Sequence, residues 1–325
     1  MKIFDGHSHL LNADYIQCLR RNGAEWEDGF PLPEWSIESH LAYMDSCGVD
    51  WSLLSLSSPH PCFGDAEECA AVCRSINEDA AGYKREYPDK IGFCAVLPLP
   101  DLKKAMEEAV YALDVLGADG IKLASNSRGL YLGDPALDPL MEELDRRGSV
   151  VIIHPHRPHA MTEGIFPSGP APLFEFLCDT TRAVLNMMGH DIFRRYPDMK
   201  VVVPHCGSFL PNIADRFAGL QTLLVQAGVL PRAIDVKGSI SRLYFDIAGS
   251  PVPDLLPLLL KTADPKHIIY GADYPFTPAQ YVKAGLERLL QAFETDPTLR
   301  PYRDGILWEN ARDLFGLSEK TGGAI

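Results

Sequence analysis

The sequence lacks any long apolar run and any excess of basic residues. No stretch of about 18 uninterrupted apolar residues occurs in the chain, so we expect no membrane span. Lysine and arginine together number 30 against 44 aspartates and glutamates, which gives a formal charge of −14. This balance argues against general affinity for nucleic acid or anionic membrane, because both need a basic face. A small anionic substrate stays compatible, since a few local cations reverse the sign of charge inside a pocket.

The chain also lacks the apolar core of a secretory signal in its opening stretch, MKIFDGHSHL. It contains no internal repeat, low-complexity segment or linker. Eight cysteines are present, but a chain of 325 residues does not need disulfides to stabilise its core. We therefore expect free thiols, a cytoplasmic location and one domain that spans residues 1–325.

Short apolar runs recur along the chain, and a helical pattern follows each of them. The runs are continuous rather than alternating, which is typical of parallel strands that are buried on both faces. Eight such runs are present, at Lys2–Phe4, Trp51–Leu56, Ile91–Leu97, Gly120–Leu123, Val150–Ile153, Lys200–Val203, Leu243–Ile247 and His267–Tyr270.

The intervening helices are indicated by their ends, such as a cap at Ser36 with Gly48 after the last turn, and a capping pattern at Asp65. Eight strands that alternate with helices predict a single (β/α)8 TIM barrel, with an extra C-terminal helix at 303–315. An open doubly wound sheet is the main alternative, but no glycine-rich dinucleotide motif follows the first strand. The loops at 12–35 and 155–171 are long, and we expect them to build the substrate pocket. Further helices are expected at 101–117, 139–147, 171–195, 209–226, 253–261 and 278–293.

Metal-binding side chains fall at the carboxyl ends of the predicted strands. His7 and His9 end the first strand, and residues two apart on a strand point to the same face, about 6.5 Å apart. His154 ends the fifth strand and Asp273 follows the eighth, so all four side chains reach the active face of a barrel. Three imidazoles and one carboxylate favour zinc or a similar divalent ion, with a position open for water or substrate.

Each of these residues also has a structural interpretation when it is taken alone. A buried histidine with one hydrogen bond is common, and Asp273 could cap the next helix. A non-catalytic metal-binding or scaffold protein is a further alternative. We favour an enzyme, because the ligands converge at matching strand ends and His205, at the end of the sixth strand, adds a further metal-competent side chain to the same face.

Two further residues are candidate substrate contacts. His156 faces the same side as His154 if the strand continues, so we expect it to line the pocket. Arg216, eleven residues after His205, is either a surface arginine or a clamp on a substrate carboxylate. Structural roles are expected for His40, His190 and His267, and His60 stays unassigned.

Four segments carry a resemblance to a known family: DGHSH at 5–9, VIIHP at 151–155, VPHCG at 203–207 and GADYP at 271–275. They resemble the amidohydrolase-2 family, which includes the aminocarboxymuconate semialdehyde decarboxylase-like and benzoate-type decarboxylases. The resemblance runs over nearly the whole chain. Within the family, the chain is most similar to the 6-methylsalicylate decarboxylase-like branch, through EWS at 34–36, LSSP at 56–59 and YLGDP at 131–135.

The resemblance implies one metal ion per chain, usually zinc and in some members manganese, with ligands at His7, His9, His154 and Asp273. It implies that His205 acts as general acid/base. It also implies that Arg216 holds the substrate carboxylate, in some members across the interface of a homodimer.

We therefore expect non-oxidative decarboxylation of a small aromatic acid of the salicylate type, or of an unsaturated carboxylic acid, with Asp273 delivering a proton to the carbon that bears the carboxylate. The alternative is hydrolysis of a lactone or amide at the same site. Two departures from the family pattern argue against the substrates of the semialdehyde and resorcylate decarboxylases. No arginine lies between Arg21 and Arg74, where the semialdehyde decarboxylases use one, and Ser208 stands where resorcylate-type enzymes tend to carry glutamate.

Overall fold

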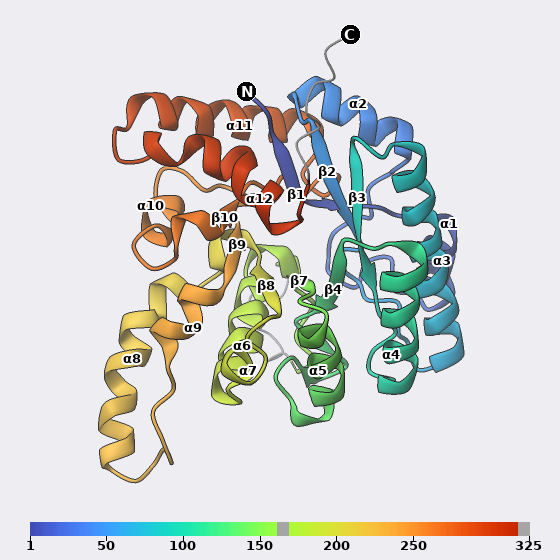
Figure 1. Cartoon of the computed structure of the whole chain (residues 1–325). Coiled ribbons are helices and arrows are strands. Elements are labelled where there is room, and N and C mark those ends of the chain that lie inside the picture. The colour runs from blue at the N-terminus through green and yellow to red at the C-terminus, as the bar shows by residue number, and fades with distance from the viewer. Residues whose placement is uncertain (161–168, 318–325) are drawn as a thin grey trace.

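The computed structural model of the chain describes residues 1–160 and 169–317. Parallel strands form a barrel at the centre of the molecule, and helices pack around its outside (Figure 1). This is the TIM barrel that the alternation of apolar runs and helical patterns predicts. Of the loop expected at 155–171, residues 161–168 lie outside the described part of the chain.

Neighbouring strands of the barrel are hydrogen-bonded in parallel and follow one another in chain order. Each of the eight predicted runs overlaps one of these strands, because every run is a buried apolar segment. The barrel strands are β1 (Phe4–His9), β2 (Trp51–Ser55), β3 (Ile91–Val96), β4 (Gly120–Ala124), β7 (Val150–His154), β8 (Lys200–Val203), β9 (Tyr244–Asp246) and β10 (Ile268–Ile269).

The barrel closes where β1 meets the chain that follows β10. The backbone N–H of His9 donates to the carbonyl of Tyr274 at 2.8 Å, and that of Asp273 donates to the carbonyl of His7 at 2.7 Å. A Cβ on Gly271 would lie 2.7 Å from the Cβ of His7, so only glycine permits this approach. The closure therefore brings the first and last predicted metal ligands together.

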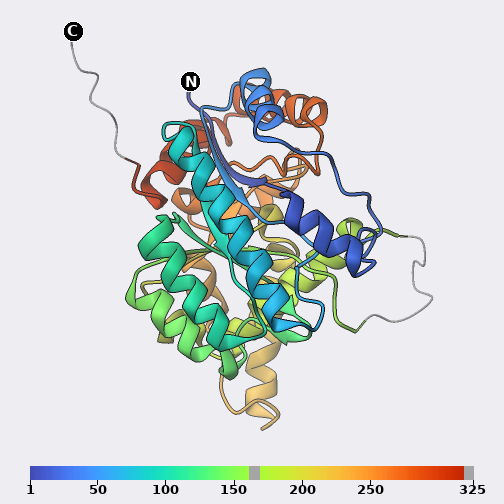
Figure 2. The same cartoon turned by 90° about the vertical axis from the view of Figure 1, so that its right-hand side faces the viewer.

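Helices cover the barrel on its outer side, and Figure 2 shows the long α3, in cyan, lying over the strands with α4 beside it. The caps expected at Ser36 for α2 and at Asp65 for α3 are present. No helix in residues 1–160 or 169–317 is long and apolar enough to cross a bilayer. The helices are α1 (Ala13–Arg21), α2 (Ile37–Cys47), α3 (Ala66–Glu86), α4 (Leu102–Tyr111), α5 (Asp138–Arg146), α6 (Glu175–Gly189), α7 (Ile192–Arg195), α8 (Leu210–Gln226), α9 (Val236–Arg242), α10 (Leu255–Leu259), α11 (Ala279–Thr295) and α12 (Asn310–Leu314).

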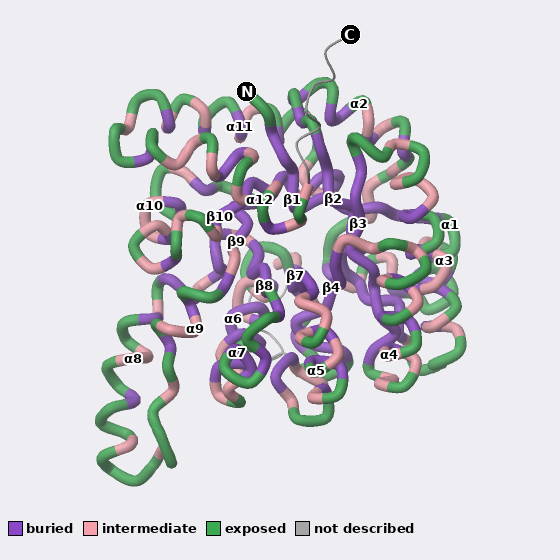
Figure 3. The backbone as a smooth tube through the Cα atoms, viewed as in Figure 1, coloured by how far each residue is buried: buried purple, intermediate pink, exposed green. Residues whose placement is uncertain are grey.

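The buried residues gather at the strands and on the inner faces of the helices, as Figure 3 shows in purple. Alternate residues of a strand enter different layers of the core. In β7, Val151 and Ile153 join the large cluster that lies between strands and helices, whereas Val150 and Ile152 join a smaller cluster with Phe4. This second cluster fills the interior of the barrel, so chemistry is confined to the open end above it.

The helical pattern is less regular than the sequence predicts. The loop expected at 12–35 contains α1, whose first turn is capped by the side chain of Asn12. The single helix expected at 171–195 is divided into α6 and α7, because Asp191 adopts a positive φ of 57° between them. A short antiparallel hairpin, β5 (Asn126–Ser127) and β6 (Leu130–Tyr131), follows β4.

The cysteines do not all remain free thiols, contrary to the expectation from the sequence. Cys62 and Cys69 form a disulfide, with their Cα atoms 4.9 Å apart. Cys62 lies in the loop after β2 and Cys69 in the second turn of α3, and the fold brings the two together. The other six cysteines are free, as predicted.

Candidate metal centre and active site

The carboxyl ends of the barrel strands bring four predicted ligands to one point. His7 and His9 lie on β1, His154 is the last residue of β7, and Asp273 follows β10. One nitrogen of each imidazole and one oxygen of Asp273 all lie within 4.8 Å of one another. The side chains that the sequence predicts to hold a metal are thus neighbours in space.

Asp273 lies closest to the two histidines of β1. Its Oδ1 is 3.0 Å from Nε2 of His9 and 3.6 Å from Nε2 of His7. The rings of His9 and His154 lie edge to face, with centroids 4.8 Å apart. The lone pairs of one carboxylate and several imidazoles therefore point into one small volume.

Each of these imidazoles contacts a second group through its other nitrogen, which orients Nε2 toward the cluster. Nδ1 of His7 is 2.8 Å from Oδ2 of Asp246, and Nδ1 of His154 is 2.9 Å from the carbonyl of Pro155. Nδ1 of His9 lies 3.4 Å from the hydroxyl of Ser55. Such partners fix ring orientation in metal sites, and a carboxylate partner also raises the basicity of the ligand.

Charge and burial set the protonation of the ligands. Burial lowers the pKa of His9 to about 4 despite its contact with Asp273, and burial also holds the pKa of His154 well below its usual range. Burial opposes the charge of Asp273, but the imidazoles of His205 and His9 keep its pKa well below the usual value. Two neutral imidazoles and an ionised carboxylate are the forms that bind a cation.

His7 differs from the other two histidines. Burial opposes a charge on its ring, but the Asp246 carboxylate outweighs this effect and raises the pKa of His7 to about 9. Its Nε2 is buried and has no hydrogen-bond partner in the described part of the chain. A buried polar atom without a partner is costly, and a cation held among the four ligands would satisfy it. The donor set therefore fits a zinc-type ion.

The loops that carry Asp273 and His205 adopt unusual backbone conformations. Asp273 has a φ of 59°, and His205, Cys206 and Ser208 have φ values of 57°, 54° and 55°. Left-handed conformations are unfavourable for such residues and cluster at functional sites. The backbone places Nε2 of His205 3.9 Å from Oδ2 of Asp273, whereas His7 and His9 lie nearer to Oδ1 of the same carboxylate.

A pocket of about 650 Å³ opens above the cluster, with His154, His205 and Asp273 among its lining residues. Its wall is largely apolar and aromatic, with Phe30, Leu32, Phe176, Phe209 and Phe276 among the lining residues. Among the described residues that line it, the acids are Glu25, Asp28 and Asp273, and no lysine or arginine is present. An anionic substrate would therefore need a bound cation, or a side chain from outside this chain, to offset the repulsion.

The acidic residues of the site other than Asp273 were not predicted from the sequence. Asp246, the last residue of β9, contacts His7 and accepts a hydrogen bond from the backbone N–H of His205 at 3.0 Å. Its position, an acid that ends a buried apolar strand, was a usable signal. Asp28 reaches the pocket from the loop after α1, and burial raises its pKa to about 6. No periodic pattern indicated that this loop residue is buried.

The two predicted substrate contacts lie elsewhere. His156 is half-buried, its Nδ1 is 3.0 Å from the carbonyl of Arg157, and it is not among the residues that line the described pocket. Arg216 lies on the exposed side of α8 and does not line this pocket either. Within the described part of the chain, the fold therefore brings neither residue to the ligand cluster.

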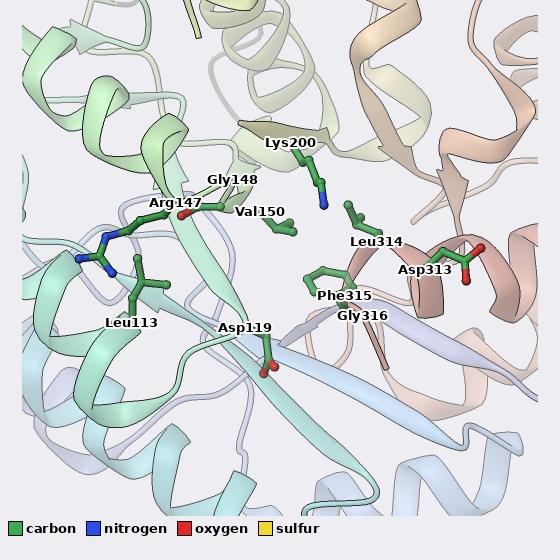
Figure 4. Close-up of a pocket in the computed structure, with 11 residues that line it drawn as sticks. Leu113, Asp119, Arg147, Gly148, Val150, Lys200, Asp313, Leu314, Phe315 and Gly316 are labelled. Carbon is green, nitrogen blue, oxygen red and sulfur yellow. The ribbon is translucent and has the colours of Figure 1, made fainter. Parts of the chain in front are cut away.

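A second cavity, of about 510 Å³, lies at the opposite end of the barrel (Figure 4). It is lined at the amino ends of the strands by residues that include Asp119, Val150 and Lys200. Its charged groups are largely paired, because Asp119 binds Lys84 and Arg147 binds Asp114. We assign no chemistry to this cavity.

Comparison with known proteins gives a consistent match over the whole barrel. The sequence model of the Amidohydrolase family matches residues 4–317. A 6-methylsalicylic acid decarboxylase from Penicillium expansum is 32% identical over 326 aligned positions, covering 99% of each chain. Decarboxylase yanB from Aspergillus niger is 33% identical over 90% of this chain and 82% of its own.

Solved structures share the fold. A crystal structure named amidohydrolase II has a TM-score of 0.89 and 35% identity, covering 97% of this chain and 100% of the other. The 5-carboxyvanillate decarboxylase from Novosphingobium aromaticivorans, complexed with manganese and a nitrobenzoic acid, has a TM-score of 0.84 at 20% identity, covering 97% of this chain and 96% of its own. At that identity the likeness concerns the fold alone.

Proposed function

The chain belongs to the Amidohydrolase family, as the sequence motifs predict, and from this premise we propose that it is a metal-dependent decarboxylase of a small aromatic carboxylic acid. The substrate is a hydroxybenzoate of the salicylate type, with 6-methylsalicylate as the leading candidate, because relatives of that activity align with the whole chain. One observation carries the proposal. Four converging ligands lie at the floor of an aromatic-lined pocket that contains acids but no described lysine or arginine.

His7, His9, His154 and Asp273 would hold the metal ion, one per chain. When bound, the ion supplies positive charge that attracts the oxygens of an anionic substrate and stabilises developing negative charge. Three imidazoles with a carboxylate suit zinc, and manganese is the alternative because a structural neighbour carries it. The same ion would offset the negative charge of Asp28 and Glu25 in the pocket.

The apolar wall fits a flat aromatic ring. Phe176 lies next to His154, with ring centroids 6.3 Å apart, and Phe276 lies 5.5 Å from His9, so the two phenylalanines flank the ligand cluster. A ring held between such side chains gains from burial and aromatic packing. Its carboxylate and phenol then lie toward the floor of the pocket, near His205 and Asp273.

The reaction requires one proton on the ring carbon that bears the carboxylate. Asp273 is ionised in the free enzyme, because its pKa lies well below the usual value. It first accepts the phenolic proton of the substrate and then delivers a proton to the ring carbon, which breaks aromaticity. Cleavage of the carbon–carboxylate bond releases carbon dioxide and returns the electron pair to the ring.

His205 serves the same proton path. Its Nε2 is 3.9 Å from the Asp273 oxygen that does not contact His9. This spacing lets His205 exchange a proton with Asp273 through a small shift or one water molecule, and so adjust the protonation of the carboxylate between steps. The net reaction consumes one proton and one carboxylate and yields the decarboxylated phenol and carbon dioxide.

Arg216 contributes across a homodimer in this proposal. It is exposed on α8, which projects away from the barrel in Figure 1, and it cannot seat the carboxylate within its own chain's described pocket. The projecting end of α8 and the loop after it expose apolar side chains at Leu220, Leu223, Leu224 and Val229. Such a surface supports contact with a second subunit. The role of His156 in binding substrate and the cytoplasmic location remain predictions.

Hydrolysis of a lactone or amide is the less favoured alternative. The same groups could activate a water molecule, but the aligned relatives are decarboxylases. The test is an assay of the metal-loaded enzyme against hydroxybenzoates, lactones and amides, with carbon dioxide and acid release measured separately. We expect carbon dioxide from one hydroxybenzoate. Acid release from a lactone or amide, with no carbon dioxide from any hydroxybenzoate, would reverse the assignment.

A further inference from the structure

Three metal-competent side chains meet at a second place in the chain, outside the site described above. His60 and Cys62 lie in the loop that follows β2, and Cys69 lies in the second turn of α3. One ring nitrogen of His60 and the two sulfurs lie within 4.8 Å of one another, and all three residues are buried. The two cysteines are joined as a disulfide in this structure.

The hydrogen bonding of His60 determines which of its nitrogens carries the lone pair. Nε2 lies 3.0 Å from the carbonyl of Leu99, which only accepts, so Nε2 must carry the proton. Nδ1 is then an acceptor, yet it is buried without a hydrogen-bond partner among the described residues. Metal-bound histidines typically donate their second N–H to a carboxylate or backbone carbonyl in this way. His60 therefore has the ring orientation of a metal-bound histidine, with Nδ1 free to bind a cation.

The loop that carries His60 and Cys62 is fixed by its surroundings. The hydroxyl of Tyr15 donates to the carbonyl of Pro59 at 2.8 Å, and Nε of Arg128 donates to the carbonyl of Cys62 at 2.6 Å. Cys69 is held by α3, whose first turn is capped by Asp65. The positions of the three donors thus do not depend on the disulfide alone, so they remain close once it is reduced.

The charges of the donors suit a divalent cation. Two thiolates and a neutral imidazole bind a doubly charged ion to give a complex with no net charge, which limits the cost of burying it. His60 is buried and its Nε2 contacts a backbone carbonyl, which leaves Nδ1 as the ring atom available to a cation.

We propose that His60, Cys62 and Cys69 form a second metal site that binds a thiophilic divalent cation such as Zn²⁺ when the cysteine pair is reduced. The ligands are Nδ1 of His60 and the two sulfurs, with a fourth position left for water or an external ligand. The disulfide and the metal-bound form exclude each other, because the same sulfurs serve both.

Entry into the metal-bound form begins with a two-electron reduction. A phosphine reductant attacks one sulfur and breaks the S–S bond; water supplies two protons to the sulfurs and its oxygen to phosphorus, which leaves as phosphine oxide. In a cell, a dithiol serves instead and becomes a disulfide. Metal binding then displaces the two thiol protons.

The site adjoins the substrate pocket, because Ser58 and Pro59, just before His60, line that pocket. It does not share a ligand with the cluster at His7, and that cluster contains no sulfur, so the catalytic cluster contributes no thiolate-to-metal charge-transfer absorption. The six free cysteines are present in the oxidised protein as well, so the difference between the reduced and the oxidised protein reports on the cysteine pair.

The test uses the whole enzyme with its catalytic metal in place. The protein is reduced with a phosphine, the reductant is removed, and Co²⁺ or Cd²⁺ is titrated while thiolate charge-transfer absorption and bound metal are measured. We expect about one further equivalent of metal per chain with a thiolate band in the reduced protein, and neither in the oxidised protein.

Matched variants assign the ligands. Cys62→Ala and Cys69→Ala should abolish the band and the additional equivalent, whereas Cys73→Ala, one turn further along α3, should retain both. His60→Asn should keep two thiolates but bind the probe metal about tenfold or more weakly. A reduced wild-type protein that shows no thiolate band, or a disulfide that the phosphine cannot open in the folded enzyme, would overturn the proposal. Loss of decarboxylase activity alone would not bear on it.

Discussion

The carboxylate of Asp246 lies 2.8 Å from Nδ1 of His7, and both side chains are buried. The other oxygen of Asp246 accepts the backbone N–H of His205. One carboxylate therefore orients a metal ligand and also holds the loop that carries the acid/base residue. The contact with Asp246 leaves Nε2 of His7 facing the cluster. This nitrogen has no hydrogen-bond partner in residues 1–160 and 169–317.

Replacing this carboxylate should weaken the metal site without removing a ligand. Asp246→Asn keeps the shape of the side chain but loses its charge, so we expect metal affinity to fall about 10- to 100-fold. Competition with a chromophoric chelator measures the Kd. Asp254→Asn, at an exposed aspartate a few residues further along, is the control. Equal affinities in the two variants would show that Asp246 does not support His7.

His205→Asn should separate catalysis from metal binding. The residue lies beside Asp273 but is not among the four grouped ligands, so metal content should stay at the wild-type level. We expect kcat to fall about 10²- to 10⁴-fold, as for loss of a general acid/base group. His190→Asn, at an exposed histidine, should leave kcat unchanged. Full turnover by the metal-loaded His205→Asn protein would remove His205 from the proton path.

Metal binding should release protons at neutral pH. In the metal-free protein the pKa of His7 is raised to about 9, so its ring is protonated at pH 7 and must lose that proton to bind a cation. The pKa values of His9 and His154 are lowered, and these rings contribute no proton. Affinity should therefore rise about tenfold per pH unit up to about pH 9 and then level off.

Calorimetry in two buffers of different ionisation enthalpy gives the number of protons released, and we expect about one per chain at pH 7. Asp246→Asn should release fewer, because its missing charge no longer raises the pKa of His7. Binding at pH 7 without proton release would contradict the charge assigned to this ring.

The α8 surface should control assembly. Leu223→Asp places a charge among the exposed apolar side chains at the end of α8, and we expect it to convert a dimer to a monomer in light scattering. Arg216→Ala should leave the dimer intact but raise KM about tenfold or more, since it removes a charged contact to the substrate carboxylate. A wild-type protein that is monomeric and active, or an Arg216→Ala variant with unchanged KM, would exclude the arginine from the site.

Much of the fold and the ligand cluster could be predicted from the sequence. Parallel barrel strands are buried on both faces, so they appear as apolar runs that are easily recognised. Residues at the ends of those runs must meet at one rim, which is why His7, His154 and Asp273 could be grouped without coordinates. The family predicted from the same motifs is confirmed over residues 4–317.

The remainder depends on tertiary packing that no local pattern encodes. Asp28 belongs to a loop and becomes a pocket residue only through the path of the chain around the barrel. Cys62 and Cys69 are paired because the loop after β2 folds back on the start of α3. Arg216 projects from an exposed helix, so a single chain cannot show what it contacts.

Metal-dependent release of carbon dioxide from 6-methylsalicylate tests the central claim most directly. The enzyme is stripped with a chelator, assayed, and assayed again after one equivalent of Zn²⁺ or Mn²⁺ per chain is restored. The account predicts turnover that disappears with the metal and returns with it, and that fails in His154→Ala. Carbon dioxide release that persists in the stripped enzyme, or none from any hydroxybenzoate after reconstitution, would contradict it.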